Sequence, residues 1–151
     1  MSASGNYEKA DELVKKLYNA GVKVHLLGCA SFNKLSKSYA WSCDASSYAR
    51  WAGLGKAIFF SKKHRSEIIL SLSEINSDDE INESFFGLEK NQCLRHEYDD
   101  FIYDGLGITI DDIAGDKSGQ LLQQANAYHM YKLEEYVTTI QKASGITFAE
   151  W

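Results

Sequence analysis

The amino-acid sequence predicts an α/β fold, and three patterns point to it. Residues 6–21 have the spacing of an amphipathic helix, and residues 22–27 follow at once as an apolar, β-branched run typical of a buried strand. Residues 39–43 form a second short apolar run, after a segment long enough for one helix. A right-handed crossover would set the two runs side by side and parallel, with Gly28 and Asp44 at one edge. Residues 118–143 carry the longest helical pattern. Helices that alternate with buried strands are typical of α/β domains.

The first predicted helix has clear ends. Asn6 is the expected N-cap and Gly21 the expected C-terminal stop, and residues 1–5 are expected to be disordered. The side chains that recur at helical spacing are Tyr7, Ala10, Leu13, Val14, Leu17 and Tyr18.

The elements that follow are short. We expect a helix within residues 31–37 and one or two helical turns over 46–52, closed by Gly53 and Gly55. Further strands are expected at 56–60 and 67–72, with a basic turn between them, although a helix fits 66–73 nearly as well.

Residues 77–115 look acidic and irregular. Within them "SDDE" (77–80) and "TIDD" (109–112) resemble capping boxes, so each is expected to open a short helix.

The helix predicted over residues 118–143 begins at Ser118 and ends before Gly145. One face carries Leu122, Ala125, His129, Leu133, Tyr136, Val137 and Ile140. The last apolar side chains of the chain, Ile146, Phe148 and Trp151, are expected to pack back onto the domain.

Length and charge narrow the class of protein. The 151 residues suit a single domain, 1–151, and the net charge of −5 argues against a broad nucleic-acid-binding surface. The basic run 62–65 allows a local basic patch, and a solvated turn is its simpler interpretation.

No run approaches the ~20 apolar residues of a membrane span. We expect a cytoplasmic protein that does not bind membranes.

Asp44 is the strongest candidate for chemistry. It ends a short apolar run, and a carboxylate at the carboxyl edge of a parallel strand lies where α/β folds bind ligands. The alternative is a helix N-cap. His25, Gly28 and Arg50 are further candidates for a ligand site. The alternatives are a core or interfacial histidine for His25 and a surface arginine for Arg50, and Gly28 lets a backbone or a ligand approach closely.

Metal or cofactor binding is poorly supported. Cys29, Cys43 and Cys93 have neither disulfide nor zinc spacing, even with His64 and His96 as further candidates. The chain has no Walker loop, GxGxxG, HExxH or GxSxG motif. We therefore expect no metal, no cofactor and free thiols.

Two stretches, "HLLG" (25–28) and "WSCDASSYAR" (41–50), resemble the last strands of the tRNA-guanine (queuine or archaeosine) transglycosylase barrel. They are most similar to divergent transglycosylase-like proteins that phages often carry, and residues 126–151 resemble the C-terminal helix of those proteins. The resemblance implies a partial, half TIM-barrel-like unit with few short parallel strands and a long C-terminal helix. It further implies Asp44 as nucleophile and His25, Gly28, Ser46 and Arg50 as ligand-binding residues.

The chain also departs from that family. Tyr48 and Ala49 replace its Pro-Thr, the zinc motif of the tRNA enzymes is absent, and so are the barrel strands that carry the general base and the purine-recognising acid. One interpretation is a binding module for a nucleobase- or nucleotide-like ligand or a host protein. The other is part of a base-exchanging glycosyltransferase, a pentosyltransferase completed by other chains. Both imply self-association or a partner chain, and both leave nucleic-acid binding open.

Overall fold

The computed structural model describes residues 3–29, 31–72 and 88–149, and its mixed helix and strand content fits the general α/β class. The chain forms two compact units. The first comprises residues 1–47 and 133–151, and the second comprises residues 48–132.

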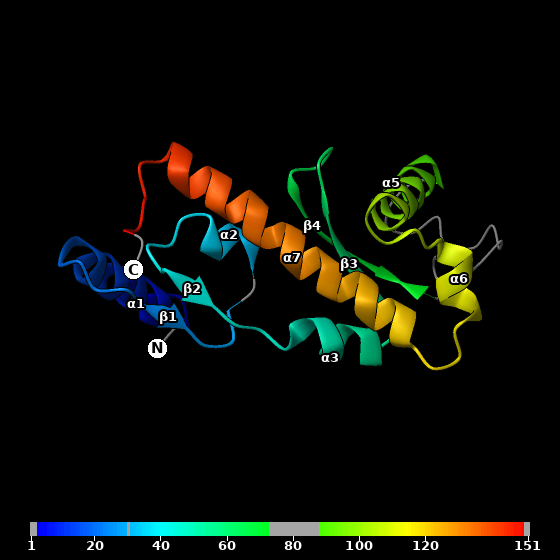
Figure 1. The fold of residues 1–151 in the computed structure, drawn as a ribbon, viewed down its shortest axis with the longest axis horizontal. Helices are drawn as coiled ribbons and strands as arrows, with labels where there is room; N and C mark the ends of the chain where they lie inside the picture. Colours follow the sequence, from blue (N-terminus) through cyan, green and yellow to red (C-terminus); the bar gives the residue numbers. More distant parts are fainter. Residues whose placement is uncertain (1–2, 30, 73–87, 150–151) are drawn as a thin grey trace. The chain divides into compact units, whose positions relative to one another are not determined.

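The first unit contains a parallel pair of very short strands. Figure 1 shows β1 and β2 running in the same direction, next to α1. The elements of this unit are α1 (Ala3–Asn19), β1 (His25–Leu26), α2 (Phe32–Leu35), β2 (Ser42–Cys43) and the second half of α7 (Gln120–Ala143).

Helix α1 stops at Gly21, as predicted. Gly21 has φ 76°, its N–H donates to Tyr18, and the Val22 N–H donates to Leu17, which is the hydrogen-bond pattern of a Schellman motif. The start of the helix differs from the prediction. Because α1 begins at Ala3, Asn6 lies inside the helix and residues 3–5 are helical.

The carboxyl-terminal segment packs against the first unit, as the sequence predicted. Ile146 is buried, and the Phe148 ring meets the Tyr18 ring edge-on at 5.4 Å between centroids. Trp151 lies outside the described residues. The buried apolar side chains of this unit are Val14, Leu35, Ala40, Leu133, Val137 and Ile146.

The second unit is built around an antiparallel hairpin. Residues 66–71 form its second strand, so this stretch is a strand and not the helix that its sequence also allowed. The register runs from Lys56 opposite Ser71 to Ser61 opposite Ser66. The elements are most of α3 (Ser47–Gly53), β3 (Lys56–Ser61), β4 (Ser66–Ser71), α5 (Leu88–Leu106), α6 (Ile110–Gly115) and the first half of α7.

Helix α5 corrects one prediction. It runs for 19 residues through a stretch that looked irregular. Leu94, Tyr98 and Ile102 are spaced by four, and all three are buried in the core of the second unit. The expected helix at 77–80 lies outside the described residues. The core cluster comprises Ala57, Phe59, Leu94, Tyr98, Ile102, Ile110, Ile113, Leu122 and Ala125.

Candidate functional site

The ends of β1 and β2 lie side by side, as the sequence predicted. His25 is the register partner of Ser42 and Leu26 that of Cys43, in parallel. The Asp44 N–H extends the pairing by donating to the Leu26 carbonyl over 3.1 Å. Gly28 and Asp44 therefore lie at one edge, the edge at which parallel sheets bind their ligands.

Asp44 joins the two strand ends. Its Oδ1 accepts a hydrogen bond from the Gly28 N–H at 2.6 Å. Gly28 has φ 66°, a left-handed conformation that glycine adopts without strain. Helix α3 begins at Ser47, so the N-cap position falls on Ser46 and the alternative role of Asp44 as that cap does not hold.

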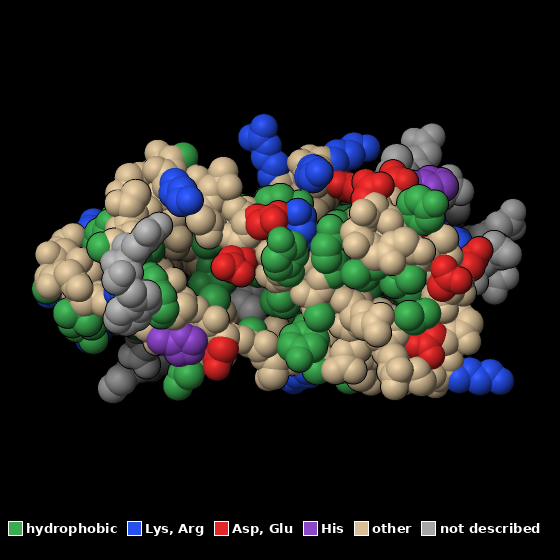
Figure 2. Space-filling view, viewed as in Figure 1, with side chains coloured by type: hydrophobic (Ala, Val, Ile, Leu, Met, Phe, Trp, Pro, Cys, Tyr) green, Lys and Arg blue, Asp and Glu red, His purple; other side chains and the backbone are tan. Residues whose placement is uncertain are grey.

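His25 completes the cluster with Ser42. The His25 Nδ1 lies 2.8 Å from the Ser42 Oγ, and its Nε2 lies 3.9 Å from the Asp44 Oδ2. The nearby carboxylate favours a proton on Nε2, in which case the Ser42 hydroxyl donates to Nδ1. Both side chains are open to solvent, His25 at 45% and Asp44 at 59% exposure. Figure 2 shows a histidine and an acidic side chain next to one another on this part of the surface.

The arrangement leaves one carboxylate oxygen available. Asp44 Oδ1 is held by Gly28, whereas Oδ2 makes no hydrogen bond to any of the described residues. An oxygen of this kind can accept a hydrogen bond from a ligand or attack an electrophilic carbon. The imidazole beside it can donate or accept a proton.

The raised pKa of the Cys43 thiol disfavours it as the nucleophile. Burial raises the pKa of its thiol, and the charges of Cys29, Asp44 and Glu134 raise it further. A raised pKa lowers the thiolate fraction at neutral pH, and the thiolate is the reactive form.

Two predicted site residues lie beyond β2. Ser46 is exposed and directly precedes α3. Arg50 is exposed on α3 and belongs to the second unit. The cluster in the first unit therefore consists of His25, Gly28, Ser42 and Asp44.

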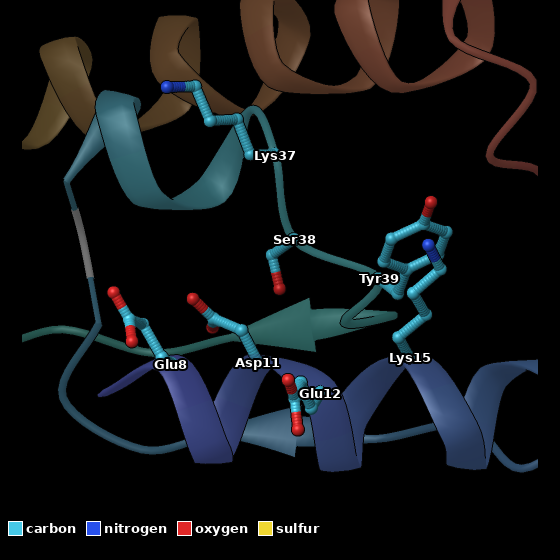
Figure 3. Close-up of a pocket in the computed structure, with 7 residues that line it drawn as sticks. All are labelled: Glu8, Asp11, Glu12, Lys15, Lys37, Ser38 and Tyr39. Carbon is cyan, nitrogen blue, oxygen red and sulfur yellow. The ribbon is translucent and has the colours of Figure 1, made fainter. Parts of the chain in front are cut away.

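A pocket of about 340 Å³ lies in the same unit but is not lined by those four residues. Figure 3 shows Glu8, Asp11, Glu12 and Lys15 on α1 and Ser38 and Tyr39 on the segment before β2, whereas Lys37 points away from α1. The ammonium of Lys15 lies 5.2 Å from the centre of the Tyr39 ring. The full lining comprises Glu8, Asp11, Glu12, Lys15, Lys37, Ser38 and Tyr39. The Asp44 carboxylate lies instead on exposed surface.

Metal-ligating side chains do not gather in the part of the chain that the structure describes. No group of three or more His, Cys, Asp or Glu residues there is arranged to hold a metal ion. Cys29 and Cys43 are free. Cys93 and His96 both belong to α5, and the Cys93 side chain lies outside the described part.

Sequence reasoning missed a buried pair in the second unit. His129, fully buried on α7, places Nε2 3.1 Å from the Glu67 Oε1 on β4, while its Nδ1 has no hydrogen-bond partner among the described residues. The helical pattern placed His129 on the buried face, but nothing local in the sequence indicated Glu67. Ser42, also missed as a site residue, lies two positions before Asp44 and so on the same strand face.

Over the described residues, no helix is both long enough and apolar enough to cross a membrane. No protein-family model, no curated protein and no solved structure matches this chain. The likeness to transglycosylases rests on the residues quoted from the sequence.

Proposed function

We propose that the first unit is a transglycosylase-like module that binds a nucleobase- or nucleotide-like ligand through Asp44 and His25, without catalysis by this chain alone. One observation supports this most directly. The carboxylate and the imidazole meet at the adjoining ends of two parallel strands, with Asp44 Oδ1 held by Gly28 and Oδ2 left open.

The chemistry of this pair suits guanine. The Watson–Crick edge of guanine carries N–H donors, and the open Asp44 Oδ2 can accept a hydrogen bond from one of them. Hydrogen bonds to a charged group contribute about 1.5–3 kcal/mol each. The His25 Nε2, 3.9 Å from Oδ2, adds a group that can pair with a neighbouring oxygen or nitrogen of the base.

The half-barrel belongs to the same proposal. The parallel pair β1–β2 supplies two adjacent strand ends, and a second copy or a partner chain supplies the strands that would complete the barrel. A two-stranded sheet has two outer edges, and an unpaired edge favours pairing with another chain.

The test is titration of the protein with guanosine, followed by calorimetry and by amide chemical shifts. Asp44→Asn keeps an oxygen for Gly28 but replaces the open oxygen with an N–H₂ donor. We expect guanosine binding to weaken at least about tenfold, which corresponds to ~1.4 kcal/mol. The melting temperature should change little.

The matched control is Asp100→Asn on α5, an exposed aspartate of the second unit. It removes the same charge and should leave guanosine binding unchanged. Guanosine binding that is equal in Asp44→Asn and the wild type, or no binding at millimolar guanosine, would overturn the proposal.

A second candidate is base exchange, favoured by the open Asp44 Oδ2. In that reaction Oδ2 bonds to C1′ of a guanosine as the C1′–N9 bond breaks and guanine leaves. A deazapurine then displaces Asp44 and restores the glycosidic bond. Incubation with guanosine-containing RNA or DNA oligonucleotides and 7-deazaguanine, followed by mass measurement of the nucleosides released from the oligonucleotide, tests this. Incorporation of 7-deazaguanine that Asp44→Asn abolishes would establish catalysis, and its absence would leave binding alone.

A further inference from the structure

The end of the β3–β4 hairpin concentrates positive charge. Lys62, Lys63, His64 and Arg65 form the loop between the register partners Ser61 and Ser66, and all four are exposed. Three permanent cations thus occupy four consecutive positions of a chain whose net charge is −5. Figure 2 shows Lys and Arg side chains standing out over this end of the hairpin. We call these four residues the basic tip.

The backbone of the basic tip is fixed by hydrogen bonds to its base and to α5. The fully buried Ser61 donates its hydroxyl to Glu97 Oε2 at 2.8 Å and accepts the His64 N–H at 3.1 Å. The Lys63 N–H donates to Glu97 Oε1 at 3.4 Å. Arg65 adopts φ 53°, a left-handed conformation that is uncommon for a residue other than glycine.

The cationic side chains themselves are not neutralised within the described part of the chain. None of Lys62, Lys63 and Arg65 forms an ion pair with an acidic side chain there. The backbone of this loop is fixed and its cationic side chains are unpaired. It can therefore bind a negatively charged partner with little loss of backbone freedom.

We propose that the basic tip docks on the phosphodiester backbone of a nucleic-acid strand, independently of base sequence. A strand is a narrow line of closely spaced charges, which the four residues of one hairpin end can contact. An anionic membrane is a broad surface that would also face the Glu97 carboxylate at the base of the basic tip. This inference goes beyond the ligand site of the first unit and does not depend on it.

Fluorescence anisotropy with a labelled single-stranded oligonucleotide of about 20 nucleotides tests the proposal. Three phosphate contacts predict a slope of about −2 for log K against log salt, because each contact on a single strand contributes about −0.7. The affinity should therefore fall roughly 15-fold between about 50 and 200 mM salt. Oligonucleotides of different base sequence should bind about equally.

Lys62→Gln/Lys63→Gln should reduce the slope to about −0.7, because a single cation remains. Lys62→Arg/Lys63→Arg should bind as the wild type does. The matched control, Lys9→Gln/Lys117→Gln, removes two charges at other exposed positions and should keep the wild-type slope.

Three results would overturn the proposal. These are a glutamine variant with the wild-type slope, the absence of oligonucleotide binding at low salt, and stronger binding to vesicles containing phosphatidylserine than to the oligonucleotide. Guanosine titration of the same glutamine variant separates the two sites, because loss of the basic tip should leave guanosine binding intact.

Discussion

Asn126 shows how one side chain can hold several backbone segments. It is fully buried on α7, and its Oδ1 accepts the Ile58 N–H at 3.0 Å. Its Nδ2 donates to the carbonyls of Lys56 at 3.0 Å and Tyr48 at 3.2 Å. One amide thus satisfies backbone groups in the first turn of α3 and at the start of β3.

Replacing Asn126 should destabilise the second unit strongly. Asn126→Leu keeps the approximate volume but leaves one N–H and two carbonyls without their partner, at about 1–3 kcal/mol for each buried group. We expect a loss of at least about 3 kcal/mol in the free energy of unfolding, measured by urea denaturation. The control Gln124→Leu changes an exposed position of the same helix and should stay within about 0.5 kcal/mol.

Gly105 is required by a neighbouring ring rather than by its own backbone. A β-carbon added at this position of α5 would collide with the phenol end of Tyr128 on α7. Tyr128 cannot swing away freely, because its ring packs on Phe101 at 5.0 Å and on Tyr131 at 6.4 Å between centroids.

The effect of Gly105→Ala should therefore depend on Tyr128. In the wild type, overpacking costs about 1–3 kcal/mol and outweighs the gain in helix propensity, which is at most about 1 kcal/mol. In a Tyr128→Ala background the collision is gone, so the same substitution should stabilise the protein. A double-mutant cycle by urea unfolding measures both, and equal effects in the two backgrounds would contradict the contact.

At the scale of elements, α6 begins with a complete capping box. The Thr109 Oγ1 accepts the Asp112 N–H at 3.2 Å, and Asp112 Oδ2 accepts the Thr109 N–H at 2.8 Å. The Thr109 N–H, and after it the Thr109 hydroxyl, which also donates to Asp112 Oδ2 at 2.8 Å, hold the pKa of Asp112 below its ordinary value. The sequence predicted this box from "TIDD", and the structure confirms it.

Because the pKa of Asp112 is lowered in the folded state, this residue makes the protein less stable as the pH falls. The carboxylate of Asp112 stabilises the folded state above its unfolded pKa of about 3.9, and this contribution is lost as the pH falls through the folded pKa. Thr109→Ala should raise the pKa of Asp112 towards its ordinary value, as read from side-chain carboxyl shifts in an NMR titration.

Asp116 is the internal control for that titration. The Ser118 hydroxyl lowers the pKa of Asp116 the most, and the backbone N–H groups of Leu121 and Ser118 lower it further. Thr109→Ala should leave the pKa of Asp116 unchanged, whereas Ser118→Ala should raise it and spare Asp112. An Asp112 pKa unaffected by loss of the Thr109 hydroxyl would show that this hydroxyl does not lower it.

For the whole molecule, we predict self-association or assembly with a partner chain. The β1–β2 sheet has two outer edges, and Leu27, beside the candidate site, is 80% exposed. Sedimentation velocity should show species larger than a monomer at micromolar concentration. Leu27→Asn should weaken the association, because it removes an exposed apolar side chain from the turn. A stable monomer in the wild type would contradict this prediction.

The sequence by itself determined the features that depend on local chemistry. Gly21 ends α1 because only a residue that accepts positive φ completes that cap easily, and "TIDD" caps α6 within four residues. The two short apolar runs predicted a parallel pair that brings Gly28 and Asp44 to one edge, because a right-handed crossover through one helix leaves few alternatives.

Only the tertiary structure decided the contacts between residues far apart in the chain. The Gly28–Asp44 hydrogen bond, the His129–Glu67 pair and the bridging role of Asn126 each join segments 16 or more residues apart. No helical or strand periodicity specifies such partners, since each depends on which backbone groups the packed core leaves to be satisfied. Helix α5 was missed for a related reason. Its apolar stripe is narrow within acidic surroundings, and its burial against β3 is what makes it stable.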